Sequence, residues 1–134
     1  YRHTGEVMSD YLCEQLNVKR KIDTKKMVLI GSHKTVSDSE LHTLNQQKPF
    51  LTLKVLQRWR AQYGDLLFEL ANQCEDQEIV SGVFKAELDY LIKYEWLSDL
   101  DDFLWRRTKL SLYLNDAEKI KLTDYWNIHY GDPT

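Results

Sequence analysis

The sequence contains few of the residues that cross-link or interrupt a small protein: two cysteines, two prolines and five glycines among 134 residues. Cys13 and Cys74 are far apart and lack metal-site spacing, so we expect two small buried thiols in a reducing compartment and no disulfide scaffold. No apolar run approaches the length needed to cross a bilayer. Because 43% of the residues are apolar, the sequence predicts one globular unit with a real core.

Patterns that would carry catalysis or bind a metal are also missing. The four histidines have no spacing that would build a metal site with one another or with the cysteines. The sequence has no glycine-rich phosphate loop, no nucleophile elbow and no calcium-binding loop. The residues alone therefore predict a helical structural or interaction domain, with no catalytic, cofactor-binding or metal-binding residue of its own.

A helical period is present, together with signals that start and stop helices. These signals are the capping-box pairs Ser37 with Glu40 and Asn115 with Glu118, and the cap and stop pair Thr52 and Gly64. The predicted helices cover about residues 1–17, 38–44, 53–63, 65–74 and 83–95, and two more begin at Ser98 and Asn115. Met27–Ile30 is the only strand candidate, and it is short. The predicted fold class is all-α: a small helical bundle with a long irregular N-terminal connection.

The bundle is expected to begin after Ser37, so that residues 1–37 form a helix and an extended connection and residues 38–134 form the helical domain. The apolar side chains of the first helix recur at helical spacing, at Met8, Tyr11, Leu12 and Leu16. This face needs a partner surface, and without one it favours self-association as a homodimer. The chain starts without an initiator methionine inside a helical pattern, so we expect a piece of a longer protein.

Charge is distributed unevenly along the chain, which has a net charge of −3. Residues 65–102 hold eleven acidic side chains against Lys85 and Lys93, and this segment should repel nucleic acid. Two basic islands remain, Lys19–Lys26 and Arg106–Lys109. A helix-turn-helix module that reads nucleic acid with the second island is a rival interpretation, and a freestanding protein-binding module is another. The acidic surroundings disfavour the first, so no nucleic-acid partner is expected.

Two charged side chains fall on helix faces that otherwise need burial. Glu87 lies three residues after Phe84 and four before Leu91. Arg107 lies three residues after Leu104 on the following helix. An isolated buried charge costs several kcal/mol, so we predict a dry, bidentate ion pair between Glu87 and Arg107. Replacing either partner by alanine is then predicted to cost ~3–5 kcal/mol of unfolding free energy.

The second basic island also offers an anion site as an alternative. Arg106, Arg107 and Lys109 could contact a substrate phosphate. Anion sites usually add a helix N-terminus or a glycine-rich loop, and neither adjoins these residues in the sequence. Arg106 and Lys109 are therefore the less favoured candidates, as anion contacts.

A family resemblance runs through residues 86–122, "AELDYLIKYEWLSDLDDFLWRRTKLSLYLNDAEKIKL". A Tyr-containing acidic helix, then Glu-Trp, an acidic turn, "LWRRTKL" and a capped final helix resemble the C-terminal helical domain of aerobic, FAD-dependent glycerol-3-phosphate dehydrogenase. Upstream, "LQRWRAQYGD" resembles the Arg-Tyr-Gly helix end of that family, and "YRHTGEVMSDYL" resembles the helix that closes its flavin domain. Ile30 is a departure, because the family usually has proline there.

The resemblance implies a C-terminal cap whose parent oxidises sn-glycerol 3-phosphate to dihydroxyacetone phosphate, using FAD and passing electrons to a membrane quinone. It implies that FAD binds outside this fragment, whose partner is the flavin domain of the same polypeptide. Only Tyr1 and Arg2 touch the flavin-side motif, and neither is assigned a catalytic role. A cytoplasmic parent, bound peripherally to the inner face of the membrane, is the expected location. The fragment alone is not expected to be catalytic.

Overall fold

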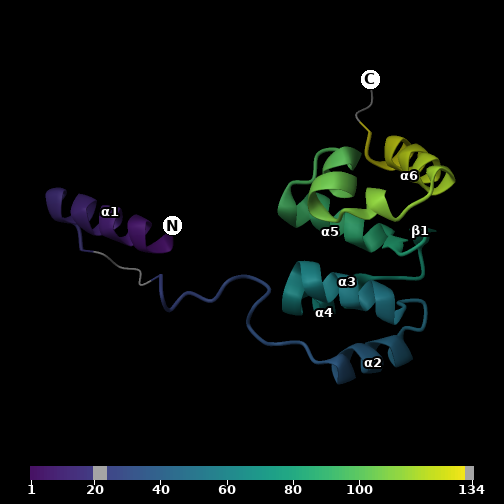
Figure 1. Ribbon diagram of the computed structural model, residues 1–134, viewed down its shortest axis with the longest axis horizontal. Helices are drawn as coiled ribbons and strands as arrows, with labels where there is room; N and C mark the ends of the chain where they lie inside the picture. The colour runs from purple at the N-terminus through teal and green to yellow at the C-terminus, as the bar shows by residue number, and fades with distance from the viewer. Residues whose placement is uncertain (20–23, 132–134) are drawn as a thin grey trace.

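The computed structural model describes residues 1–19 and 24–131, and they form a mostly helical fold with one very small sheet (Figure 1). The predicted helical fold class is confirmed. The elements are α1 (Arg2–Gln15), α2 (Asp38–Gln47), α3 (Leu53–Tyr63), η1 (Gly64–Leu66), α4 (Leu67–Gln73), β1 (Glu78–Val80), β2 (Val83–Phe84), α5 (Lys85–Glu95), η2 (Asp102–Arg107), η3 (Leu110–Leu112) and α6 (Asp116–His129). The basic island Lys19–Lys26 falls partly outside the described residues.

Helix α1 lies apart from the bundle in Figure 1, and none of its residues is buried. Its larger apolar side chains are each more than half exposed: Val7, Met8, Tyr11, Leu12 and Leu16. The apolar side predicted for this helix is therefore left uncovered by the described part of the chain. Such a row of apolar side chains usually marks a surface that packs against something else.

The bundle starts where its local signals predict. Ser37 and Asn115 each close a complete capping box, the first at α2 and the second at α6. The Thr52 hydroxyl accepts from the Val55 amide at 3.4 Å and opens α3, and Gly64 ends that helix with a φ of 60°. Each cap satisfies a backbone N–H that has no partner inside its helix.

The first capping box should make α2 sensitive to acid. The Glu40 carboxylate accepts from the Ser37 amide at 2.8 Å and from Lys34 Nζ at 2.9 Å. These contacts, the backbone bond first, lower the pKa of Glu40 from 4.5 to about 2. A carboxylate with a lowered pKa stabilises the folded state above its ordinary pKa, and this stability is lost as the pH falls toward the folded value. Urea unfolding of Glu40→Gln should show a smaller loss of stability than the wild type between about pH 4.5 and 2; identical profiles would contradict this.

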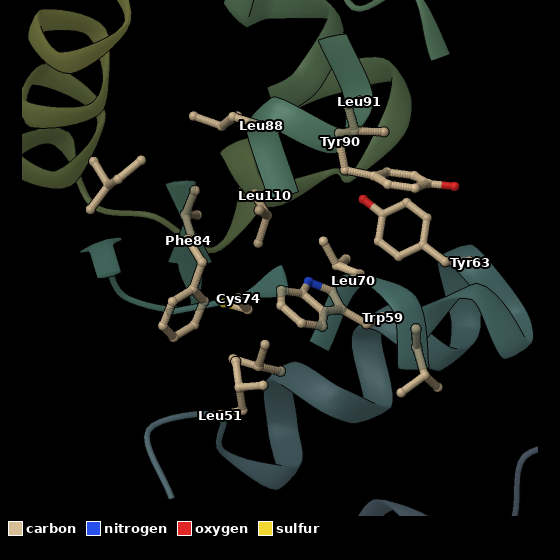
Figure 2. Close-up of a cluster of buried hydrophobic side chains, with 14 of the residues drawn as sticks. Leu51, Trp59, Tyr63, Leu70, Cys74, Phe84, Leu88, Tyr90, Leu91 and Leu110 are labelled. Carbon is tan, nitrogen blue, oxygen red and sulfur yellow. The ribbon is translucent and has the colours of Figure 1, made fainter. Parts of the chain in front are cut away.

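The core joins α3, α4 and α5 (Figure 2). Trp59 is fully buried and meets the Phe84 ring edge-on, with the ring centroids 6.1 Å apart. Phe50 packs on the same Phe84 ring at 5.9 Å. Leu122 and Trp126 bury one side of α6 against the rest. Aromatic rings at these separations and tilts contribute beyond their buried area, so this cluster fixes the relative position of the helices.

The strand prediction is wrong in position. The structure forms an antiparallel pair from β1 and β2, joined through Gly82 at a φ of 75°. Strands of three and two residues are too short to show an alternating pattern, which is why the sequence gives no signal for them. Met27–Ile30, the predicted candidate, is exposed and forms no strand. Because Val83 pairs with Val80, the helix predicted from Val83 begins only at Lys85.

The segment after α5 also departs from prediction. Asp99, not Ser98, accepts the amide hydrogen of Asp102, at 2.6 Å. The following turn, η2, is a π-helix, in which Thr108 N–H donates to the Phe103 carbonyl five residues before it, at 3.0 Å. A π turn holds more residues than an α turn, so side chains point in directions that α spacing does not predict. This explains why Arg107 does not lie where the α-helical pattern predicts it.

The long connection is fixed to the bundle before α2 begins. The Gly31 carbonyl accepts from the Asp65 amide at 3.1 Å, and the Lys34 amide donates to the Asp65 carboxylate at 3.0 Å. Lys34 Nζ also lies 4.0 Å from the centroid of the Phe68 ring. Val36 is buried in the core. Gly31 is therefore a point at which the connection is fixed to the bundle.

Candidate functional site: a buried arginine–glutamate pair

The one fully buried acidic side chain among residues 1–19 and 24–131 is Glu87, in the first turn of α5. Arg58 of α3 holds it through two parallel bonds, Nη1 to Oε1 at 2.5 Å and Nη2 to Oε2 at 2.6 Å. The Tyr63 hydroxyl donates to the same Oε1 at 2.8 Å. Arg58 Nη2 also donates to the Gly82 carbonyl at 2.8 Å. The structure thus pairs Glu87 with Arg58, and the predicted partner Arg107 is wrong.

Burial and charge act in opposite directions on the pKa of Arg58. Burial lowers the pKa of the guanidinium, but the Glu87 carboxylate, by its charge and its hydrogen bonds, outweighs burial and raises it overall. Burial, followed by the charge of Glu87, raises the pKa of the Tyr63 phenol. Both donors therefore stay protonated near neutral pH. A buried carboxylate whose oxygens already accept three hydrogen bonds is a positioned structural charge.

Arg107 has a different role. Its Nε donates to Asp102 at 2.5 Å, its Nη1 to the Glu95 carboxylate at 3.2 Å and its Nη2 to the Glu95 carbonyl at 2.8 Å. The hydrogen bond from Arg107, ahead of other causes, lowers the pKa of Asp102. Glu95 is the last residue of α5, so Arg107 joins the end of that helix to η2. A cation at a helix C-terminus also interacts favourably with the helix dipole.

The two candidate anion contacts face oxygen atoms of their own segment. Arg106 is 70% exposed and its Nη1 lies 3.6 Å from Asp102. Lys109 Nζ donates to the Trp105 carbonyl at 2.5 Å. Both cations are thus engaged within their own segment, and anion binding by Arg106 and Lys109 stays a prediction.

Sequence reasoning missed Arg58 and Tyr63. Arg58 is three residues after Val55 and four before Gln62, so these three lie on one face of α3. Val55 is buried, and Gln62 Oε1 accepts from Arg58 Nη1 at 3.0 Å. The position of Arg58 on a partly buried helix face is the signal that could have identified it as the partner of Glu87.

The geometry can be compared with known proteins. Residues 22–123 match the family described as the C-terminal domain of alpha-glycerophosphate oxidase. The chain belongs to this family. The matched residues include both partners of the Arg58–Glu87 pair and every element from α2 to η3. Helix α1 precedes the matched residues.

Curated relatives extend the match. A glycerol-3-phosphate dehydrogenase of Pseudomonas aeruginosa is 31% identical over 108 residues, which cover 76% of this chain and 21% of the relative. The aerobic glycerol-3-phosphate dehydrogenase of Escherichia coli K12 is 32% identical over 113 residues, covering 80% of this chain and 22% of the relative. A D-erythritol 1-phosphate dehydrogenase of Brucella abortus is 25% identical over 91 residues, covering 64% and 18%. The chain thus spans about a fifth of the length of these relatives, and the resemblance given by its sequence is confirmed.

The residues of this C-terminal domain do not fit a flavin dinucleotide. Dinucleotide sites use clustered glycines before a free helix N-terminus. Here the five glycines are dispersed, and none directly precedes an α-helix of the described residues. The N-termini of α2, α3 and α6 are each occupied by a side-chain cap, whereas α1, α4 and α5 have none and begin after Tyr1, Leu66 and Phe84. Within the described ranges, no cluster of three His, Cys, Asp or Glu side chains is arranged to hold a metal ion. No helix formed by these residues has the length and apolar character to cross a membrane.

The two thiols of the domain should differ sharply in reactivity. Cys74 is buried, and burial raises the pKa of its thiol to about 12. Cys13 on α1 is only partly buried. Because the thiolate is the reactive form, a disulfide reagent near neutral pH should modify Cys13 in the native chain and Cys74 only after unfolding. Counting the released chromophore in wild type and Cys13→Ser tests this; rapid native labelling of Cys13→Ser would contradict it.

Proposed function

We propose that this chain is the C-terminal cap of a longer glycerol-3-phosphate dehydrogenase that oxidises sn-glycerol 3-phosphate to dihydroxyacetone phosphate. The match of residues 22–123 to the oxidase C-terminal domain carries the proposal. The names of the two relatives at 31% and 32% identity support the substrate. Division of the chain into a linking segment, residues 1–37, and a cap, residues 38–134, belongs to the same proposal.

In this proposal the parent would hold FAD, which would supply the chemistry for accepting a hydride, and a membrane quinone would be the final electron acceptor. FAD would be bound by residues outside this chain, because the cap offers no glycine-rich cradle. The parent would be cytoplasmic and peripherally bound to the inner face of the membrane. None of these steps requires a catalytic residue from the cap.

The cap's own contribution is structural. Helix α1 lies apart from the bundle (Figure 1). Its apolar row is uncovered, and the bundle has a core of its own. We infer that the row docks on the flavin domain of the same polypeptide, and that a homodimer is the alternative occupant. The Arg58–Glu87 pair joins α3 to α5 within the bundle.

A nucleic-acid function has less support. Arg106 and Arg107, the core of the second basic island, both lie against Asp102. Guanidinium groups engaged by a carboxylate have less free charge to offer to phosphates. A duplex DNA binding assay at two salt concentrations should detect no binding by this chain.

The activity is tested with the full-length protein that contains this chain. We expect a bound flavin absorption spectrum and glycerol 3-phosphate-dependent reduction of a soluble quinone analogue. D-erythritol 1-phosphate is the control substrate, because it is named for the Brucella abortus relative. Oxidation of the erythritol phosphate without oxidation of glycerol 3-phosphate would overturn the proposed substrate.

Docking is tested by placing a charge on either side of α1 in the full-length protein. Leu12→Glu changes the apolar row, whereas His3→Glu adds the same side chain on the opposite face. Leu12→Glu should lower the melting temperature of the flavin domain and reduce retained flavin, and His3→Glu should change neither. Equal effects of the two variants would contradict docking through the apolar row.

A further inference from the structure

We propose that the cap carries a binding site for an organic cation, in a cavity of about 730 Å³ between the Gly31 turn, the end of α3 and one face of α5. Three tyrosines and two glutamates line it: Tyr63, Tyr90, Tyr94, Glu69 and Glu95. We call this the tyrosine cavity. It is separate from the substrate chemistry proposed for the parent and does not depend on it.

The aromatic wall of the tyrosine cavity is continuous. The Tyr63 and Tyr90 rings pack edge-on with their centroids 5.8 Å apart, and the Tyr90 and Tyr94 centroids are 5.2 Å apart. Figure 2 shows the Tyr63 and Tyr90 rings close together, with their hydroxyl groups pointing in opposite directions. Because the Tyr63 hydroxyl is bound by Glu87, the position of its ring is fixed by the buried pair. The wall is thus held in place before any ligand arrives.

The charged side chains that line the tyrosine cavity beside this wall are mainly the carboxylates of Glu69 and Glu95. Glu69 accepts one bond from Gln73, at 3.4 Å. Within residues 1–19 and 24–131 it makes no close ion pair, and the Lys93 ammonium acts on it by charge alone. Burial raises the pKa of Tyr90, and the carboxylates of Glu95 and Glu69 raise it further. The phenol therefore lies in a negative potential.

The cations near the cavity are already engaged. Arg60 lines it but donates to Asp38 at 2.7 Å and to the Val36 carbonyl at 3.4 Å. Arg107, which touches Glu95, also donates to Asp102. Among residues 1–19 and 24–131, Glu69 is consequently the lining carboxylate without a close ion pair, and Lys93 acts on it only by charge.

A cationic ligand fits these features better than an anion or a neutral molecule. The faces of tyrosine rings attract ammonium and guanidinium groups, and a carboxylate beside them adds a direct charge interaction. Tyr94 already attracts Lys93 from outside the cavity lining, with Nζ 4.8 Å from the ring centroid. The volume is in the range of cavities that hold small ligands, so it has room for a guanidinium group and the stem that carries it. That group can belong to a free organic cation or to an arginine side chain displayed by a polypeptide.

Binding is tested by NMR titration of the 134-residue chain with matched probes. n-Butylguanidinium represents the free cation, and neutral n-butylurea is its control. Acetyl-Gly-Arg-Gly-amide represents the displayed side chain, and the same peptide with citrulline is its control. We expect saturable shifts at Tyr90, Tyr94 and Glu69 with at least one cationic probe, at least about tenfold tighter than with its neutral control. Tighter binding of the peptide assigns the source to a polypeptide, and tighter binding of butylguanidinium assigns it to a free cation.

Variants locate the site. Tyr94→Leu and Glu69→Gln should each weaken cation binding several-fold; both residues are exposed enough for the fold to tolerate the change. The matched controls are Tyr113→Leu and Glu75→Gln, which make the same changes at exposed positions outside the cavity lining. Three outcomes would overturn the proposal. They are unchanged affinity in both cavity variants, equal shifts with charged and neutral probes, and no saturable shift with any probe.

Discussion

Replacing Arg58 by methionine should lower the unfolding free energy of the chain by ~3–5 kcal/mol, because it leaves the Glu87 carboxylate buried without its counter-charge. Glu87 is fully buried and only 18% of the Arg58 side chain is exposed, so water cannot readily take the place of the guanidinium. Methionine keeps much of the arginine stem volume, which limits the contribution of a cavity. Urea unfolding followed by tryptophan fluorescence measures the change.

The double variant Arg58→Met with Glu87→Gln isolates the cost of the stranded charge. The amide introduced in place of the carboxylate would carry no charge and would still offer an oxygen to the Tyr63 hydroxyl, so the double variant should be more stable than Arg58→Met alone. Arg107→Ala is the contrasting variant: this side chain is 29% exposed, and its loss should cost only ~1–2 kcal/mol. Equal losses for Arg58→Met and Arg107→Ala would contradict the assignment of the buried pair.

Replacing Gly64 by alanine should cost ~2–6 kcal/mol, through backbone strain of about 1–3 kcal/mol and a clash of similar size. Gly64 has a φ of 60° and a ψ of −132°, a conformation that residues with a Cβ rarely adopt. An added Cβ would lie 1.8 Å from the Gly31 carbonyl oxygen, which itself accepts from the Asp65 amide. The chain would have to move away from the bundle at this point.

Two measurements separate this effect from ordinary glycine replacement. Gly82→Ala is the matched control, because Gly82 also has a positive φ but its added Cβ would only touch Val55 at 3.4 Å, and it should cost ~1–2 kcal/mol. Trypsin should cut after Lys34 faster in Gly64→Ala than in Gly82→Ala. The Lys34 amide donates to the Asp65 carboxylate, next to the close approach of Gly31 to Gly64. Equal cleavage rates in the two variants would show that Gly31 is not fixed by Gly64.

The helix starts could be predicted because their causes are local. Ser37 and Asn115 each bond a residue three positions ahead, so the interaction is visible in the sequence. The same holds for Thr52 and for the glycine that ends α3. By contrast, β1 and β2 depend on a turn and on burial against α6, and neither leaves a periodic pattern in five residues.

The buried charge could be predicted, but not its partner. Glu87 stands among apolar residues of its own helix, and this pattern is local. Its partner Arg58 lies 29 residues earlier, and only the packing of α3 on α5 selects it over Arg107. The π-helical turn at η2 then takes Arg107 toward Asp102, an outcome that α-helical spacing could not show. Long-range packing is therefore the part of the site that the sequence alone leaves open.

The fixed point at Gly31 also bears on how strongly the cap needs to bind its partner. Residues 16–30 separate the end of α1 from Gly31, so helix and bundle stay covalently joined whatever α1 packs against. Under the proposed docking on the flavin domain of the same polypeptide, the contact would be intramolecular, and short tethers give effective concentrations in the millimolar range. A docking contact too weak to join two separate molecules would then suffice to hold the cap on the flavin domain. Loss of that contact would leave the bundle folded, because the bundle has its own core.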